Sequence, residues 1–152
     1  MAKPMIQRCI DPSVISGIIN HPKVYDFLTD DNIKNHIPVI HPSIIYLVDE
    51  TKQGVIRVDP MNSISCYVHI ATTPTMWGNG HKFVKDAIEW GFKNTQYLKI
   101  VAIVPVYNKE TLKLVRDVGF KEEGICTRSF LKNWKLHDQI IFGLNKGDMS
   151  CL

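Results

Sequence analysis

Alternation of apolar and polar residues predicts a strand and then a helix near the middle of the chain. Over residues 63–70, four apolar side chains alternate with four more polar ones: Ile64, Cys66, Val68 and Ile70 against Ser63, Ser65, Tyr67 and His69. This period of two is typical of a half-buried strand. Beyond residue 80 the period lengthens, and one helical face collects Phe83, Val84, Ala87, Ile88 and Phe92. We therefore predict a strand that ends near Thr72 and a helix that begins near Gly80.

The N-terminal part predicts a short edge strand and two helices. Residues 5–10 have the pattern of the edge strand. Asp11 and Pro12 then open a helix, because aspartate is a favoured N-cap and proline suits the first helical position. A second, short helix is expected over 24–28. Residues 30–42 mix acidic and amide side chains with two prolines, so we expect a loop that shapes a pocket.

Three strands with short connections follow, which indicates an antiparallel meander. The first two strands are expected over 44–49 and 54–58, with a hairpin turn at 51–54. A second turn, Asp59–Asn62, leads into the central strand.

A further strand is predicted over 97–106, beside the central one. Its core, KIVAIV, is apolar without alternation, so we expect both of its faces to be covered. A strand, a helix and another strand in this order form a right-handed parallel unit. Asn108 then caps a helix that ends at Gly119. Two long strands follow over 121–145, with a turn at 132–135.

This order predicts a single domain over residues 1–152, with a mixed α/β (α+β) sheet whose N-terminal half is antiparallel. The length and the 45% hydrophobic and 22% charged content suit one soluble globular core. A net charge of +3 is too small to indicate nucleic-acid binding. The start lacks the apolar core of a signal peptide, and no apolar stretch is long enough to span a bilayer. We therefore expect a cytoplasmic protein, monomeric or homodimeric.

The cysteines and histidines do not form a metal-binding pattern. His36 and His41 lack a carboxylate partner at ligand spacing, and the four cysteines are far apart: Cys9, Cys66, Cys126 and Cys151. We expect no metal and, in a reducing compartment, no disulfide. Cys66 lies on the apolar side of its strand and is predicted to be in the core.

A glycine-rich loop, Trp77-Gly78-Asn79-Gly80-His81, joins the central strand to its helix. A helix N-terminus presents unpaired N–H groups and the positive end of the helix dipole, and so favours an anion. The first turn carries His81 and Lys82 instead of carboxylates, and positive charges there oppose the helix dipole. A bound phosphate would make these positive charges favourable. The alternative is a glycine-rich turn with solvated lysines. Ligands prefer the carboxyl ends of parallel strands, where this loop and Asn108 both lie.

These residues resemble the GNAT superfamily of N-acetyltransferases, and most closely its ribosomal-protein N-terminal acetyltransferases. Thr75–Gly80 is similar to the acyl-CoA signature Gln/Arg-x-x-Gly-x-Gly/Ala of the superfamily. Asn108–Thr111 resembles its Asn-x-x-Ser, and Gly119–Gly124 resembles its Gly-Phe-x-x-Glu-Gly. Asp138 matches an aspartate in the final strand. Four matches in order, each in the right strand or helix context, make the resemblance specific.

The resemblance implies the GNAT fold, with parallel, splayed fourth and fifth strands and helices on both faces of the sheet. It implies acetyl-CoA as cosubstrate and an amine acceptor as partner. Loop N–H groups would bind the pyrophosphate, and the free edge of the central strand would pair with the pantetheine arm. The residues implied in cofactor binding are Ile70, Ala71, Thr72, Trp77, Gly78, Asn79, Gly80, His81, Lys82 and Asn108. Asn108 can also be a plain N-cap, and Trp77 can instead anchor the loop in the core.

Two residues are candidates for catalysis. The resembling subgroup has a hydroxyl at the position of Thr111 that acts as the proton source for the leaving thiolate. The alternative is that Thr111 is an ordinary residue in the first turn of the helix. His69, on the polar face of the central strand, suits a general base near pH 7. Its alternative is a histidine hydrogen-bonded beneath the cofactor or a helix, with a water chain as the base. Trp90 and Trp134 are predicted to be packing residues.

Two positions depart from the family pattern. Thr75 replaces the Gln or Arg of the signature, and Val115 stands where many members place a tyrosine as general acid. Two hypotheses follow. The first is an N-acyltransferase that moves an acetyl group to a primary amine, of a protein N-terminus or a small molecule, by direct attack in a ternary complex. The alternative is a catalytically degenerate protein on this fold with a binding, structural or assembly role, including a phage-encoded one.

Overall fold

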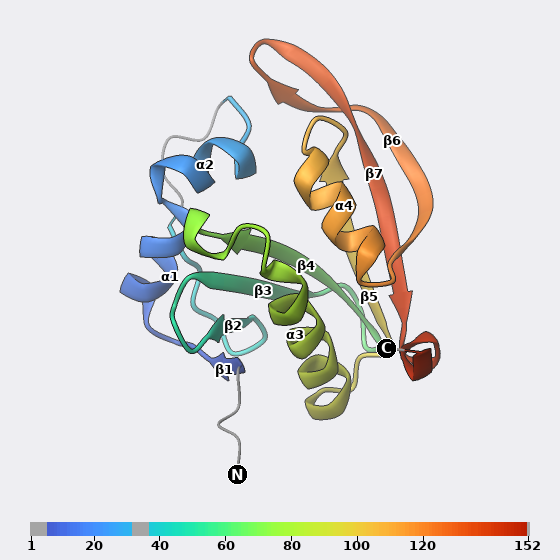
Figure 1. Cartoon of the computed structure of the whole chain (residues 1–152). Helices are drawn as coiled ribbons and strands as arrows, with labels where there is room; N and C mark the ends of the chain where they lie inside the picture. Colours follow the sequence, from blue (N-terminus) through green and yellow to red (C-terminus); the bar gives the residue numbers. More distant parts are fainter. Residues whose placement is uncertain (1–5, 32–36, 152) are drawn as a thin grey trace.

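The computed structural model describes residues 6–31 and 37–151 as one mixed sheet with helices packed against it (Figure 1). The elements in chain order are β1 (Ile6–Arg8), α1 (Pro12–Ile19), α2 (Pro22–Leu28), β2 (Ile45–Asp49), β3 (Gly54–Pro60), β4 (Ser65–Thr72), the 3₁₀ turn η1 (Pro74–Met76), α3 (Gly80–Asn94), β5 (Lys99–Pro105), α4 (Lys109–Asp117), β6 (Lys121–Lys132), β7 (Lys135–Asn145) and the 3₁₀ turn η2 (Lys146–Cys151).

The strand order across the sheet is β1-β2-β3-β4-β5-β7-β6. Neighbouring strands are antiparallel except β4 and β5, which are parallel. The mixed sheet and the antiparallel N-terminal half are therefore confirmed. The parallel pair arises because α3 carries the chain back along the sheet before β5 begins.

Helices cover both faces of the sheet, as predicted. On one face, α1 packs Ile15 and Ile18 against Tyr46 of β2 and Val55 of β3. The other face holds the larger apolar cluster, to which α3 and α4 contribute the residues Phe83, Val84, Ala87, Ile88, Phe92, Leu112 and Val115. Figure 1 shows α1 and α2 grouped together, away from α3 and α4.

The helix starts have the predicted caps. Asp11 Oδ1 accepts a hydrogen bond from the Ser13 amide at 2.9 Å, and Pro12 occupies the first turn of α1. The α4 cap is Asn108, whose Oδ1 accepts from the Thr111 amide at 3.2 Å. These caps fix where each helix begins, and in α4 the cap places Thr111 in the first turn.

The parallel strands β4 and β5 pair over three residues only. Their register runs from Ser65 opposite Lys99 to Tyr67 opposite Val101 and then stops. On its other side β4 stays paired with β3 as far as Thr72, and β5 stays paired with β7 as far as Pro105. The sheet therefore splits between β4 and β5, while each of these strands remains hydrogen-bonded to its other neighbour. This is the splay that the resemblance implied.

Several predicted details differ from the structure. Ile64 lies before β4 and is 49% exposed, because β4 begins at Ser65 and residue 64 belongs to the turn. The strand predicted over 54–58 does begin at Gly54, as β3, but it continues to Pro60. Trp134 is 88% exposed at the tip of the β6–β7 hairpin, so its predicted packing role is wrong. Trp90 does pack against the α3 cluster.

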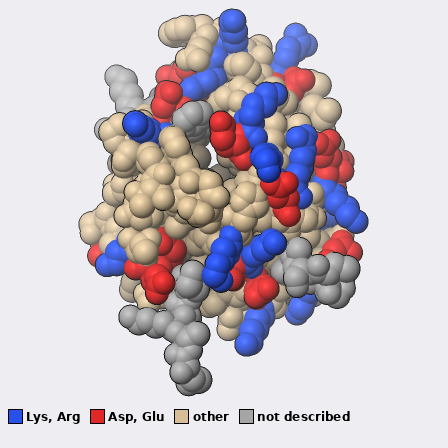
Figure 2. Space-filling model, in the orientation of Figure 1, with Lys and Arg blue, Asp and Glu red and all other residues tan. Residues whose placement is uncertain are grey.

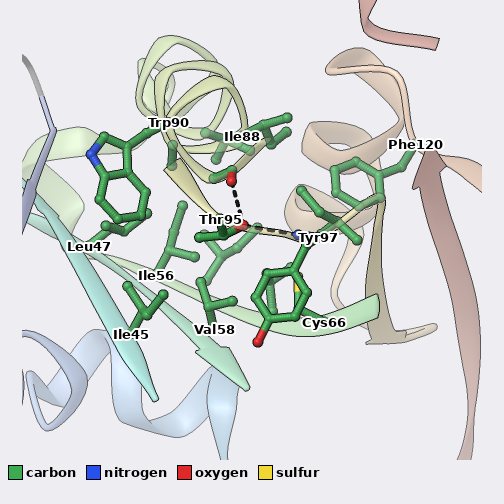
Figure 3. A pocket seen from close by; sticks show the side chains of 16 residues that line it. Ile45, Leu47, Ile56, Val58, Cys66, Ile88, Trp90, Thr95, Tyr97 and Phe120 are labelled. Carbon is green, nitrogen blue, oxygen red and sulfur yellow. Dashed lines mark hydrogen bonds between the residues drawn. The ribbon is translucent and has the colours of Figure 1, made fainter. Parts of the chain in front are cut away.

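A small apolar void of about 30 Å³ lies between α3 and the sheet (Figure 3). Trp90, Ile88 and Tyr97 surround it, and Thr95 donates a hydrogen bond to the Gly91 carbonyl at 2.6 Å at the end of α3. Its lining is apolar, and it belongs to the core instead of the split between β4 and β5. Cys66 also lines it and is buried, as predicted.

Candidate active site

A cavity of about 160 Å³ occupies the split between β4 and β5. Its walls come from four parts of the chain: Tyr67, Val68, His69 and Ile70 of β4; Ala102, Ile103, Val104 and Pro105 of β5; Asn108, Thr111 and Val115 around α4; and Leu28, Phe130 and Gln139 at the far end. Figure 2 shows the surface hollowed in this region, between α2 and α4 of Figure 1. The structure thus brings four predicted site residues, His69, Ile70, Asn108 and Thr111, to one cavity.

The β4 edge beyond Tyr67 faces this cavity without a β5 partner. Buried backbone groups need hydrogen-bonding partners, so such an edge suits an extended, amide-bearing ligand. Ile70 lies in the cavity wall, whereas Ala71 and Thr72 continue the strand beyond it. The Thr72 carbonyl already accepts a hydrogen bond from the Trp77 indole N–H at 3.0 Å. Trp77 thus anchors the loop to β4, while its side chain stays 48% exposed and outside the core.

The glycine-rich loop forms the N-terminus of α3. Gly78 has φ +85°, a conformation that favours glycine, and Asn79 follows it without capping the helix through its side chain. Gly80 is buried beside α4, where an added Cβ would lie 3.8 Å from Leu114 Cδ2. The first turn of α3 carries no acidic residue. These features leave the first amides of the helix available to an anion, so the loop fits a pyrophosphate.

Two predicted ligands at this terminus have carboxylate partners of their own. His81 Nε2 lies 2.9 Å from Asp117 Oδ2 and so joins α3 to α4. Lys82 Nζ lies 3.1 Å from Asp86 Oδ2, one turn further along α3. Hydrogen bonds from Lys113 and then His81 lower the pKa of Asp117. The backbone of His81 and Lys82 therefore fits anion binding better than their side chains do.

Asn108 and Thr111 lie where β5 gives way to α4. Asn108 is 7% exposed; its amide donates to the Pro105 carbonyl at 3.0 Å and its side chain caps α4. Its N-cap role is confirmed, and it also lines the cavity. Thr111 is half-buried in the same wall. Val115, one turn further along α4, is fully buried and gives the cavity an apolar wall at the position of the missing tyrosine.

His69 approaches the cavity from β4, in the company of two charged residues of β3. Its Nε2 lies 3.7 Å from Asp59 Oδ2, and Asp59 in turn pairs with Arg57. The ring of His69 meets the ring of Tyr67 edge to face, with centroids 4.3 Å apart. The histidine side chain forms part of the cavity wall and is 52% exposed to solvent.

Two tyrosines near the cavity were missed by the sequence analysis. Burial, and then the charge of Asp59, raise the pKa of Tyr67, which lines the cavity. Burial, and then the charges of Asp26 and Asp31, raise the pKa of Tyr107 to about 12. The Tyr107 ring packs near Phe130 and His137. Its place at the carboxyl end of a parallel strand was a usable signal.

Beyond the cavity residues Leu28 and Phe130, the α2 region contacts the tip of the β6–β7 hairpin. Asp31 accepts hydrogen bonds from the Asn133 amide at 3.0 Å and the Trp134 amide at 2.8 Å. Lys132, buried at the same tip, donates to the Thr29 carbonyl at 2.9 Å. Asp31, the second residue of the predicted pocket loop 30–42, thus holds the hairpin. Residues 32–36, including His36, lie outside the described part.

Thr75 is exposed in η1 and does not line the cavity. Within residues 6–31 and 37–151, no group of three or more His, Cys, Asp or Glu residues is placed to hold a metal ion. Among the helices of the described chain, none has the length and apolar character needed to cross a membrane.

No family model and no curated protein sequence matches this chain. Solved structures do match its fold. Spermidine N-acetyltransferase from Vibrio cholerae, in complex with CoA and spermine, is 18% identical with a TM-score of 0.78, covering 95% of this chain and 96% of that one. Ribosomal-protein-S5-alanine acetyltransferase from Vibrio fischeri is 17% identical with a TM-score of 0.73, covering 98% of this chain and 97% of that one.

This chain therefore has the fold of these two N-acetyltransferases. In particular, the parallel, split β4 and β5 with helices on both faces give the chain the GNAT fold. At these identities the likeness establishes the fold, and the chemistry rests on the site.

Proposed function

We propose that this protein transfers an acetyl group from acetyl-CoA to a primary amine. The observation that carries the proposal is the cavity in the β4–β5 split, which has His69 on one wall and Thr111 on the other. Acyl transfer from a thioester to an amine needs a base that takes the amine proton and a group that supplies a proton to the leaving sulfur, and this cavity is lined by a candidate for each. The complex of the Vibrio cholerae neighbour with CoA and spermine supports the same pair of ligands for this fold.

Acetyl-CoA would supply an acyl group activated as a thioester. The amides of Gly80, His81 and Lys82 at the start of α3 would hold its pyrophosphate, because the Asn79 side chain does not cap this helix and no acidic residue occupies its first turn. The Trp77 and Asn79 amides already donate to the Pro74 and Met76 carbonyls. The β4 edge at Ile70 and Ala71, unpaired with β5, would pair with the pantetheine amides. Asn108 lines the cavity just beyond the carboxyl end of β5, where it would contact the cofactor.

The two candidate catalytic residues divide the proton transfers. His69 takes a proton from the amine as its nitrogen bonds to the acyl carbon. The Thr111 hydroxyl hydrogen-bonds to the sulfur as the carbon–sulfur bond breaks and passes to it a proton drawn from solvent, in place of the tyrosine hydroxyl that Val115 cannot supply. The amine nitrogen loses one proton to His69, which returns it to solvent, and the sulfur gains one, so the step is balanced and both side chains end in their starting states.

The test is transfer measured by mass spectrometry of the acceptor. Purified protein is incubated with acetyl-CoA and, separately, spermidine, spermine, a peptide with an N-terminal alanine and simple alkylamines. We expect an acetylated product with at least one acceptor. We also expect His69→Gln and Thr111→Val to lower kcat by about a hundredfold each, the usual size of an acid or base contribution. Acetyl-CoA hydrolysis without acceptor acetylation, or no reaction at all, would overturn the proposal.

One observation favours a second candidate, a CoA-binding protein without turnover. Val115 is fully buried in the cavity wall and leaves no ionisable group at that position of α4. Calorimetry with acetyl-CoA separates the two candidates. Heat of binding together with no acetylation of any acceptor would support the second one, and absence of binding would exclude both.

A further inference from the structure

The side chains of β3 and β4 form a charged cluster on the face of the sheet that α1 and α2 cover. Arg57 and His69 are direct cross-strand partners, and Asp59 stands opposite Tyr67 in the same register. Because side chains of alternate residues share one face, these four residues lie together. Two of them, Tyr67 and His69, line the cavity, whereas Arg57 and Asp59 do not. The proposed chemistry thus leaves Arg57 and Asp59 without a role.

Arg57 holds the Asp59 carboxylate at both oxygens. Its Nε lies 2.8 Å from Oδ2 and its second guanidinium nitrogen 2.9 Å from Oδ1. Both side chains are largely buried. Burial by itself would lower the pKa of Arg57, but the hydrogen bonds and charge of Asp59 outweigh it, and the pKa is raised. A bidentate pair of this kind fixes the plane of the carboxylate.

Asp59 in turn faces one edge of the His69 ring. The Oδ2 atom that accepts from Arg57 lies 3.7 Å from His69 Nε2, and the Tyr67 ring packs against the imidazole in a T-shaped arrangement. A carboxylate beside Nε2 favours the proton on that nitrogen and leaves Nδ1 as the acceptor. Among the described residues, the charged groups beside His69 include Arg57 and Asp59 of β3, and the Tyr67 phenol of β4 is a titratable neighbour.

We infer that Asp59 is a positioning residue for His69, and that Arg57 holds Asp59 in the orientation this requires. The inference rests on the proposed function, in which His69 is the general base. In the chain of contacts, the guanidinium fixes the carboxylate, the carboxylate sets the tautomer and tilt of the imidazole, and the Tyr67 ring limits its rotation. Only His69 meets the substrate.

The test reads the imidazole directly and needs no turnover. Nitrogen NMR of the histidine rings, with His69 assigned through His69→Gln, gives its titration midpoint and tautomer in the whole protein. In Asp59→Asn we expect the midpoint to move to lower pH by roughly half a unit, because a carboxylate that stabilises the imidazolium is lost. We also expect the Nε2-protonated tautomer to lose its dominance. An unchanged midpoint and tautomer in this variant would overturn the inference.

The kinetic arm uses the same variant. We expect kcat to fall about tenfold, KM for acetyl-CoA to stay within about twofold, and the acid limb of the kcat profile to follow the NMR midpoint. A uniform fall in kcat at all pH values, with the NMR midpoint unmoved, would assign Asp59 a structural role only. If no acceptor is ever acetylated, the proposed function fails while the NMR result still decides whether Asp59 sets His69.

Two further variants guard against misfolding and nonspecific effects. Arg57→Lys keeps the charge but loses the bidentate geometry, so we expect a smaller midpoint shift in the same direction and a fall of a few fold in kcat. Glu122→Gln breaks another arginine–carboxylate pair, that with Arg116, away from the cavity. It should leave the His69 midpoint and kcat unchanged. An equal shift in Glu122→Gln would show a general charge effect and overturn the inference.

Discussion

Tyr67 of β4 and Val101 of β5 are the last residues that pair across the split in the sheet. Beyond them each strand keeps its outer partner, so the split does not depend on a bound ligand to stay open. The free edge of β4 and the start of α3 are both in place before any ligand arrives. Such preorganisation lowers the ordering cost of binding.

The first prediction concerns the uncapped start of α3, where stability and binding should change in opposite directions. Asn79→Asp places a negative charge at the positive end of the helix dipole, so we expect the free protein to gain about 0.5 kcal/mol in urea unfolding. The same charge would repel a pyrophosphate, so acetyl-CoA affinity should fall about tenfold or more by calorimetry.

Asn94→Asp is the matched control, since it makes the same change at the other end of α3. It should slightly destabilise the free protein, because a carboxylate there opposes the dipole. Acetyl-CoA affinity should stay unchanged. Weaker binding in both variants to the same degree would mean that the start of α3 is not the anion site.

The second prediction concerns Gly54, which packs against Phe83 and Met76, the residues on either side of the glycine-rich loop. A Cβ at Gly54 would lie 2.7 Å from Phe83 Cε2 and 2.9 Å from Met76 Sδ, on either side of the loop. Because the phenyl ring is packed in the core, Gly54→Ala should lower the free energy of unfolding by about 1–3 kcal/mol. It should also weaken acetyl-CoA binding, since α3 has to shift.

Gly143→Ala serves as its control. A Cβ at Gly143 is crowded only by the carboxylate end of Glu123, a flexible side chain that pairs with Lys99. That side chain can move away, so the loss should stay below about 1 kcal/mol. Equal losses in the two variants would argue against a rigid contact between Gly54 and Phe83.

The third prediction concerns the Asp31 carboxylate that holds the hairpin tip. Asp31→Ala removes the acceptor for two amides, so hydrogen exchange at Asn133 and Trp134 should speed up roughly tenfold or more. Asp138→Ala, which removes the acceptor of the Arg128 amide instead, should speed exchange at Arg128 and leave the tip protected. Unchanged exchange at the tip in Asp31→Ala would contradict this arrangement.

The same contact has a defined pH dependence. The hydrogen bond from the Trp134 amide is the main cause that lowers the pKa of Asp31 below its ordinary 3.8. A carboxyl group with a lowered pKa in the folded state stabilises it above the unfolded value and loses that contribution as the pH falls. Protection of the two amides should therefore persist at pH 5 and decline only below about 3.8.

The fourth prediction concerns Cys66, whose thiol is buried in the core. Burial raises the pKa of this thiol from 9.0 to about 12. At pH 8, iodoacetamide should therefore label the partly exposed Cys126 in the native protein and spare Cys66, as peptide mass spectrometry will show. Stability should fall as the pH rises above 9, because the unfolded chain releases this proton first. Rapid labelling of Cys66 would mean that this part of the core opens readily.

Local patterns were enough to predict most of the fold. The alternation around Cys66 and Val68, the helical stripe of Phe83 and Val84, and the cap at Asp11 all depend on near neighbours in the sequence. The strand–helix–strand rule then placed β5 beside β4. For the site, the resemblance supplied Asn108 and Thr111, and strand alternation placed His69 on the polar face; the structure brings all three to one cavity.

What could not be predicted depends on contacts between distant residues. Trp134 was expected to pack because it is large and apolar, but it lies at a turn with φ +60°, 88% exposed. The pKa of Tyr107 is raised by burial and by the charges of Asp26 and Asp31, which are far away in the chain. The Arg57–Asp59–His69 cluster required the β3–β4 register, which the pattern of each strand alone does not give.

The hydrogen bond from Trp134 to Asp31 joins positions 103 residues apart. Ribosomal synthesis delivers α1 and α2 early, yet the hairpin that completes the end wall emerges only near the close of translation. Contacts of such long range are formed late and slowly in folding. A nascent chain released before residue 134 would hold strands β1 to β5 and the glycine-rich loop, but it would lack β7, and with it the part of the cavity wall that Gln139 forms.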